Sequence, residues 1–146
     1  MTVDPAVREA MKGFPLSAKI ALAVEVARLY VLARWLLVRR GLQSAVGALR
    51  GGLRAHSAAG SEQLRFVRGA RFGHAVIRVL RVLPADDRCL MRSLVLTGLL
   101  ARRGVYAKLV IGVRPNPTFA AHAWVEVDGL PVLEANEQEY HRLLEL

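Results

Sequence analysis

The hydrophobic pattern of the sequence changes in kind near residue 84, and this change constrains the fold more than any other feature. Before that point the apolar residues recur at helical spacing, whereas after residue 104 they alternate with polar residues, as in half-buried strands. The segment "CLMRSLVLTGLLARR" at 89–103 is apolar nearly all round, which predicts a central, buried helix. Helices followed by antiparallel strands predict an α+β fold.

The chain has 146 residues, a length that favours a single domain, 1–146, with a helical portion at 1–83 and a core at 84–146. Glycine and proline set the expected element boundaries, because both interrupt regular helices. Besides the central helix, helices are expected at 17–40, 42–50 and 62–82, and strands at 105–114, 119–128 and 130–134.

The stretch at 20–38 is apolar enough to raise the question of a membrane span. Glu25, Arg28 and Arg34 interrupt it, and a spanning helix needs about 20 predominantly apolar residues. Each central charge costs about 2.5–3.5 kcal/mol on insertion, so no membrane span is predicted. The charges are scattered around the helix axis, which favours a helix that packs on several sides or docks against a partner.

Positive charge is concentrated in the first half of the chain. Residues 1–83 carry fourteen Lys and Arg against four Asp and Glu, or +10, whereas residues 84–146 carry seven against eight, or −1. A basic half can bind nucleic acid, anionic lipid or an acidic polypeptide, or it can be a solvated surface. No recognisable nucleic-acid-binding motif accompanies it, so nucleic acid is not predicted as a partner.

Cys89 is the only cysteine, and it lies in the first turn of the predicted buried helix, where Asp86 or Asp87 is expected to be the N-cap. A lone cysteine is often a small buried hydrophobe. In a first helical turn, however, unpaired backbone N–H groups and the helix dipole favour the nucleophilic thiolate and can stabilise an oxyanion. Cys89 is therefore a candidate nucleophile, with a structural role as the alternative.

A cysteine nucleophile needs a base beside it, and the four histidines differ as candidates. His56 falls in a linker, His141 in an exposed tail, and His74 in an arginine-rich helix, where a packing role is expected. His122 lies on the predicted second strand between small residues, which leave room for another element to approach its ring. The alternative is that His122 has a structural role only, with its hydrogen bonds satisfied within the sheet.

Two blocks, "CLMRSL" and "AHAWVE", resemble the transglutaminase-like cysteine peptidases of lasso-peptide biosynthesis, in particular the stand-alone leader peptidases. The resemblance is strong over residues 84–134 and weaker over the N-terminal helices. It implies a transglutaminase/papain-like catalytic core at 84–146, on which the basic helical portion 1–83 packs. It also implies that Cys89 is the nucleophile and His122 the general base.

The resemblance places the acid that orients the imidazole at Glu134. Other side chains that could reach the ring are Asn136, Glu126 and Asp128. If residues 127–129 form a three-residue loop with Gly129 left-handed, positions whose numbers sum to 256 pair, and Glu134 faces His122. A two-residue Asp-Gly turn raises the sum to 257 and puts Glu134 on the opposite face of the sheet. The Glu134 assignment therefore predicts the longer loop.

Three more residues are expected around the site. Arg92 is a candidate substrate contact or an ion-pair partner, Ser93 packs or hydrogen-bonds beneath the thiol, and Trp124 forms a wall. As zinc ligands, Cys89, His122 and Glu134 would be an uncommon set without close-spaced pairs. We therefore expect neither a metal nor an organic cofactor.

The resemblance implies a bacterial, cytoplasmic enzyme, and a single cysteine and an N-terminus unlike a signal peptide agree with that compartment. The implied reaction is hydrolysis of the leader–core bond of a ribosomally made lasso-peptide precursor through an acyl-enzyme. The implied partners are the precursor peptide, a small leader-recognition protein and an ATP-dependent lasso cyclase. The helix at 20–38 and the arginines of 62–82 are expected to dock the leader-recognition partner.

Two alternative functions stay open. The first is another acyl transfer at the same site, such as amide formation by a transglutaminase relative. The second is a non-catalytic basic helical module that binds a membrane or nucleic acid, with Cys89 in a structural role.

Overall fold

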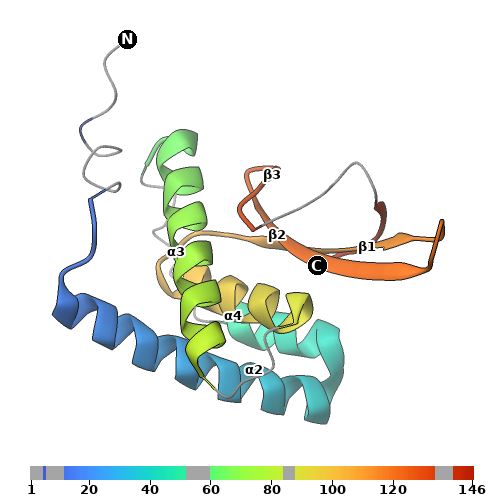
Figure 1. The fold of residues 1–146 in the computed structure, drawn as a ribbon, viewed down its shortest axis with the longest axis horizontal. Coiled ribbons are helices and arrows are strands. Elements are labelled where there is room, and N and C mark those ends of the chain that lie inside the picture. The colour runs from blue at the N-terminus through green and yellow to red at the C-terminus, as the bar shows by residue number, and fades with distance from the viewer. Residues whose placement is uncertain (1–4, 6–11, 52–59, 84–87, 134–139) are drawn as a thin grey trace.

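The computed structural model describes residues 5, 12–51, 60–83, 88–133 and 140–146. Within these residues, three helices precede a four-stranded antiparallel sheet with the strand order β3-β2-β1-β4, so the predicted α+β class is confirmed (Figure 1). The elements are α2 (Leu16–Arg50), α3 (Glu62–Val82), α4 (Cys89–Arg102), β1 (Lys108–Arg114), β2 (Ala120–Val127), β3 (Leu130–Pro131) and β4 (His141–Glu145).

The central helix α4 lies between α2 and the sheet and also contacts α3 (Figure 1). Every residue from Ser93 to Ala101 is buried, as its apolar surface predicts. Gly98 lets α2 approach closely, since a Cβ there would lie 3.1 Å from side-chain carbons of Leu29 and Leu49. After α4, Gly104 adopts a φ of 74°, the left-handed conformation expected of a glycine that ends a helix.

Helix α2 contains the two helices predicted at 17–40 and 42–50. They meet at Gly41, whose φ of 77° and ψ of 173° break the helical geometry. A glycine adopts this conformation without the steric cost that a side chain would bring. Among the described residues, no helix combines the length and the apolar character needed to cross a bilayer.

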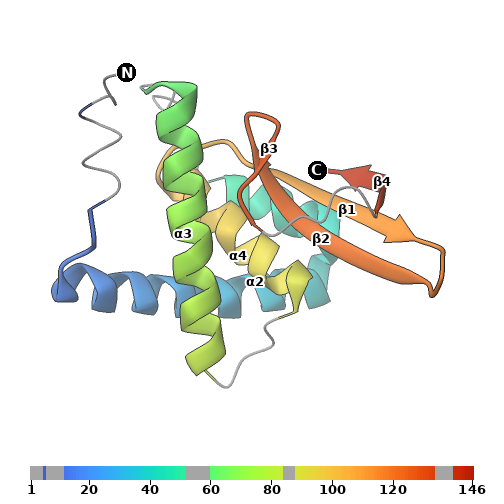
Figure 2. The same ribbon diagram turned by 45° about the horizontal axis from the view of Figure 1, so that its top comes forward.

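The N-cap of helix α3 is Ser61, whose hydroxyl accepts a hydrogen bond from the Leu64 N–H at 3.2 Å. It packs closely on the chain that follows β3, because a Cβ at Gly73 would lie 2.8 Å from the carbonyl oxygen of Val132. Figure 2 shows α3 crossing α4 next to the β2–β3 end of the sheet. This contact holds residues 132–133 close to the start of α4.

Two strand predictions need correction. β3 covers residues 130–131, and the chain bends at 132 and 133, which were also predicted as strand; residue 134, the end of the predicted strand, lies outside the described residues. The segment 141–145, expected to be a tail, forms β4 and pairs with β1, placing Ile111 opposite Leu144 (Figure 2). All five β4 residues are exposed, so their sequence has no buried face from which a strand can be predicted.

Candidate active site

Cys89 is the first residue of α4 and is half-buried with a free thiol, so its predicted place in the first turn is confirmed. The N-cap residue is Arg88, not Asp86 or Asp87, which lie outside the described residues. No side chain among the described residues caps the helix, so the first N–H groups of α4 lack intrahelical or side-chain partners there. The thiol therefore lies beside backbone donors that an anion can use.

His122 lies on β2, half-buried and paired with Gly112 of β1. Its ring centroid is 6.1 Å from that of Trp124 and 5.4 Å from that of Tyr140. Gly112 makes this arrangement possible, because a Cβ there would lie 2.8 Å from the Trp124 ring and 2.9 Å from the Tyr140 Cβ. Two aromatic rings therefore lie next to the imidazole.

Cys89 and His122 are 33 positions apart, yet they line one cavity of about 30 Å³. Among the described residues, the lining consists of Ile77, Cys89, Arg92, Ser93, His122, Ala123 and Leu133. One water occupies roughly 10–15 Å³ by such a measure, so the cavity has room for a water-sized group rather than a substrate side chain.

Ser93 follows Cys89 by one helical turn, so the two side chains share a face of α4. The Ser93 hydroxyl is fully buried and lines the cavity, and it has no hydrogen-bond partner among the described residues. Its backbone carbonyl, in contrast, accepts a hydrogen bond from Thr97 Oγ1 at 2.8 Å. A buried hydroxyl without a partner costs about 1–3 kcal/mol, which makes Ser93 an unusual residue at this position.

Trp124 is 1% exposed and lies behind the imidazole rather than on the surface of the site. Its indole N–H donates to Glu126 Oε1 at 2.9 Å, and Arg142 of β4 donates to both oxygens of Glu126 at 2.7 and 3.2 Å. The hydrogen bond from Arg142 to Glu145, followed by its hydrogen bonds to Glu126, raises the pKa of Arg142 above its usual range. The Glu126 carboxylate is therefore occupied by Trp124 and Arg142.

The three-residue loop predicted at 127–129 is wrong. Asp128 and Gly129 have φ values of 51° and 78°, and Val127 pairs with Leu130, so the turn has two residues and the numbers of paired residues sum to 257. A type I′ turn needs positive φ at both central positions, and its twist matches that of the strands. The cross-strand argument for Glu134 therefore fails.

Glu134 itself lies outside the described residues, as does Asn136. The register ends at Val132, whose N–H donates to the Val125 carbonyl at 2.9 Å. The next residue, Leu133, lines the cavity with Cys89 and His122. The assignment of Glu134 thus rests on the resemblance alone and stays a prediction. The remaining alternative, Asp128, is occupied by Arg65 at 2.7 Å.

The sequence matches the family described as the transglutaminase-like superfamily over residues 27–145. This match covers most of the chain, including α4 and the whole sheet. The chain belongs to the transglutaminase-like superfamily. Searches of curated proteins and of solved structures gave no match. Membership in the superfamily suggests Cys–His acyl transfer or peptidase activity, and a thiol and an imidazole on one cavity suit that chemistry.

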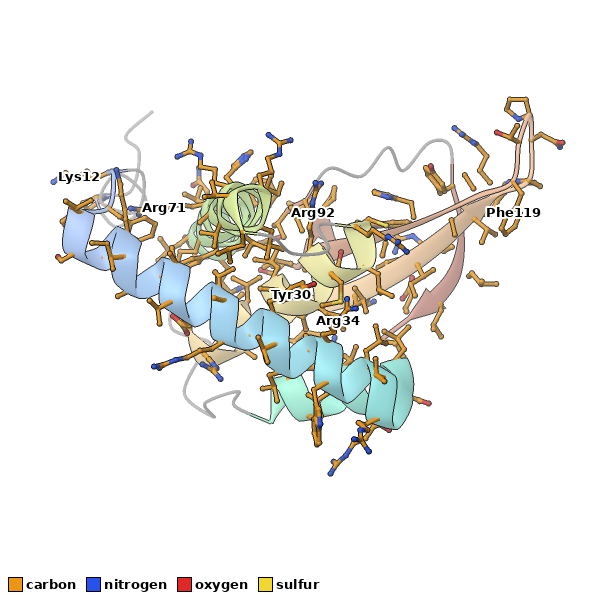
Figure 3. All side chains as sticks on the ribbon, turned by 60° about the horizontal axis from the view of Figure 1, so that its bottom comes forward. Lys12, Tyr30, Arg34, Arg71, Arg92 and Phe119 are labelled. Carbon is orange, nitrogen blue, oxygen red and sulfur yellow. The ribbon has the colours of Figure 1, made fainter. Side chains whose placement is uncertain are left out.

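The other histidines of this transglutaminase-like chain lie elsewhere. His74 is exposed on α3, contrary to the expected packing role, and lines a separate cavity with Lys12 and Arg71, two side chains that lie close together in Figure 3. His141 is exposed on β4, and His56 lies outside the described residues. Among the described histidines, His122 alone lines the Cys89 cavity.

Sequence reasoning missed three contributors to the transglutaminase-like site, namely Gly112, Leu133 and Tyr140. A glycine within a strand often marks a close approach, so Gly112 carried a usable signal. Leu133 and Tyr140 carried none, because their positions depend on the bend after β3 and on the pairing of β4.

Proposed function

We propose that the protein is a bacterial, cytoplasmic cysteine peptidase that removes the leader from a lasso-peptide precursor. The observation that carries the chemistry is that Cys89 and His122 line one cavity at the start of α4. The resemblance of the "CLMRSL" and "AHAWVE" blocks to leader peptidases supports the substrate class. No metal or organic cofactor takes part in the proposed reaction.

In the proposed mechanism, His122 takes the proton from the Cys89 thiol, and the thiolate attacks the scissile carbonyl carbon. The N–H groups at the start of α4 stabilise the resulting oxyanion. His122 then donates its proton to the departing amine of the core peptide, which leaves a leader thioester on Cys89. A water molecule, deprotonated by His122, hydrolyses the thioester and releases the leader carboxylate.

Glu134 is the proposed orienting acid, which holds one ring nitrogen of His122 so that the other faces the thiol. Arg92 and Ser93 line the cavity and are the proposed contacts near the scissile bond, with Trp124 supporting the ring of His122. In this scheme a small leader-recognition protein presents the precursor, and an ATP-dependent cyclase uses the amine that cleavage exposes.

The decisive experiment is mass spectrometry of the precursor encoded beside this protein, incubated with the purified chain and the neighbouring leader-recognition protein. Hydrolysis yields a leader with a free carboxylate, and in water enriched in heavy oxygen that carboxylate takes up the label. Amide formation, the alternative acyl transfer, instead yields an adduct of higher mass without label. An intact precursor after incubation with wild-type protein would refute both reactions for this substrate.

A further inference from the structure

Helix α2 has a second apolar face, opposite the one that packs on α4. Leu22, Val26 and Leu29 belong to the buried face. The outer stripe, as we call the second face, consists of exposed residues at helical spacing: Leu16 (73% exposed), Ile20 (58%), Val24 (45%), Val31 (66%), Trp35 (50%) and Val38 (78%). With 1.5 Å of rise per residue it is roughly 33 Å long.

No described element covers the outer stripe. In Figure 1, α2 runs along the lower side of the molecule with α4 and the sheet above it, and in Figure 3 it is the nearest element to the viewer. Folding of the described residues therefore does not account for the apolar character of this face. Contiguous exposed apolar surface of this kind marks an interaction site.

The shape of the stripe fits another helix. A shallow groove of about 620 Å³ lies on α2, lined by Val24, Ala27, Arg28, Val31, Leu32 and Trp35. Residues 24, 27, 28 and 31 have the spacing i, i+3, i+4, i+7, and residues 28, 31, 32 and 35 repeat it. Four residues at this spacing form the hole that receives one side chain of a facing helix in knobs-into-holes packing. The small Ala27 side chain deepens the first hole.

The charges beside the stripe select an acidic partner. At 100° per residue, Arg28 and Arg34 lie on opposite flanks of the stripe, and both are exposed. Glu25, the one acidic residue of α2, is already bonded to Arg103 at 2.7 and 2.8 Å. A second copy of α2 would bring arginines against arginines, whereas glutamates at the flanking positions of a partner helix would pair with them.

We propose that the outer stripe of α2 docks an acidic amphipathic helix of a partner protein. Apolar side chains of that helix enter the two holes around Ala27 and Val31, and its carboxylates face Arg28 and Arg34. Two arginines of α3 are already engaged elsewhere, since Arg65 is paired with Asp128 and Arg71 stacks on the Phe14 ring at 3.6 Å. Docking on α2 is independent of the reaction at Cys89.

Fluorescence of Trp35 provides the test, because the only other tryptophan, Trp124, is already buried. The probes are two synthetic heptad peptides with leucine at the a and d positions, one with glutamate and the other with lysine at e and g. We expect the glutamate peptide to shift the Trp35 emission to the blue and to bind about tenfold more tightly than the lysine peptide. The double variant R28E/R34E should reverse this preference.

A matched pair of substitutions locates the contact. Val31→Asp should weaken binding of the glutamate peptide by about tenfold or more, whereas Val82→Asp, at a valine of α3 that is 86% exposed, should leave it unchanged. Circular dichroism checks that both variants stay folded. Equal affinity for the two peptides, or a preference that R28E/R34E does not reverse, would overturn the proposal.

Two further measurements address other occupants of the stripe. Phosphatidylglycerol vesicles that shift Trp35 when neither peptide does would assign the face to an anionic membrane, and the proposal would be wrong. Sedimentation velocity that shows a dimer abolished by Val31→Asp would assign it to a second copy. The proposed cleavage of the precursor does not depend on what binds the outer stripe. Failure of the docking proposal can therefore be distinguished from failure of the peptidase proposal.

Discussion

Helices α2 and α4 both consist mainly of apolar residues, but they differ in how much of their surface is exposed to water. In α4 the run from Ser93 to Ala101 contains no charge and is buried on every side. In α2, by contrast, charges interrupt the apolar sequence at Glu25, Arg28 and Arg34, and one apolar face stays exposed. The position of charges along a helix, rather than its apolar content, therefore indicates whether it is enclosed.

The two helices also have different roles in the molecule. The start of α4 carries the thiol and its N–H donors, and the surrounding elements fix that end in place. The outer stripe of α2 contributes nothing to that cavity and is available to a partner. Substitutions in α4 are thus expected to alter chemistry and stability, and those in the outer stripe to alter binding.

The largest expected effect is complete loss of leader cleavage in Cys89→Ala, because the chain has no other thiol. The side chain is half-buried at a helix end, so the fold should be kept, which thermal melting can verify. Val31→Ala in α2 should leave cleavage of the free precursor within about twofold of wild type, since such surface changes are small. Full cleavage by a folded Cys89→Ala protein would disprove the mechanism.

Structural features that depend on neighbouring residues in the chain could be predicted from the sequence, whereas features that depend on distant residues could not. The buried α4, its end at Gly104 and the strand carrying His122 all follow from local patterns, and the structure has them as predicted. The β4 strand forms by pairing with β1 and has no pattern of its own. The length of the turn at Asp128 was misjudged because Asp-Gly suits both candidate loops, and strand twist favours the shorter one.

The meeting of Cys89 with His122 lies beyond local reasoning for a similar reason. Nothing in the spacing of the two residues brings them together, and only the packing of α4 on β2 does so. The resemblance to leader peptidases supplied that pairing in advance. Tyr140 belongs to no recognised block, and its contact with the imidazole follows from the position of β4 beside β1.

The next largest effect is expected for Glu134→Gln, which should slow cleavage by roughly 10²–10⁴ without abolishing it, as loss of an orienting acid does. Glu134→Asp should retain more activity, because a carboxylate remains. Glu126→Gln is the control, since that carboxylate is bonded to Trp124 and Arg142 and should affect stability more than kcat. If Glu134→Gln cleaves at the wild-type rate, Asn136 becomes the next candidate.

A stability comparison tests the two helices directly. Leu99→Ala in α4 removes a fully buried side chain and should lower the free energy of unfolding by about 2–5 kcal/mol. Val31→Ala in α2 should change it by less than about 0.5 kcal/mol, because the side chain is 66% exposed. Urea denaturation of both variants measures the difference. Similar losses in the two would mean that the outer face of α2 is covered in the folded chain.

Ser93→Ala separates chemistry from stability within α4. Its hydroxyl has no partner in the described structure and lies one turn from Cys89, where it can donate to the thiolate. Removing it should slow alkylation of Cys89 by iodoacetamide about tenfold at neutral pH, because a hydrogen bond to a charged group is worth about 1.5–3 kcal/mol.

Stability should be unchanged or higher in Ser93→Ala, since an unsatisfied buried hydroxyl is lost. Thr97→Val is the matched control, because it removes a hydroxyl that is bonded to the Ser93 carbonyl. It should lower stability by about 1 kcal/mol and leave alkylation unchanged. An unaltered alkylation rate in Ser93→Ala would restrict that serine to packing.

The smallest expected effect concerns the ion pair that joins α2 to the end of α4. Hydrogen bonds from Arg103 lower the pKa of Glu25 from its usual 4.5, and the side chain is partly exposed, so the pair should contribute at most about 1 kcal/mol. Because the folded-state pKa is the lower one, this contribution is complete above the unfolded value and is lost as pH falls through the folded value. The difference in unfolding free energy between wild type and Glu25→Gln should therefore shrink below about pH 4.5.

A double-mutant cycle with Arg103→Gln isolates the coupling energy between Glu25 and Arg103. A coupling energy near zero at pH 7 would mean that apolar burial alone holds α2 against α4.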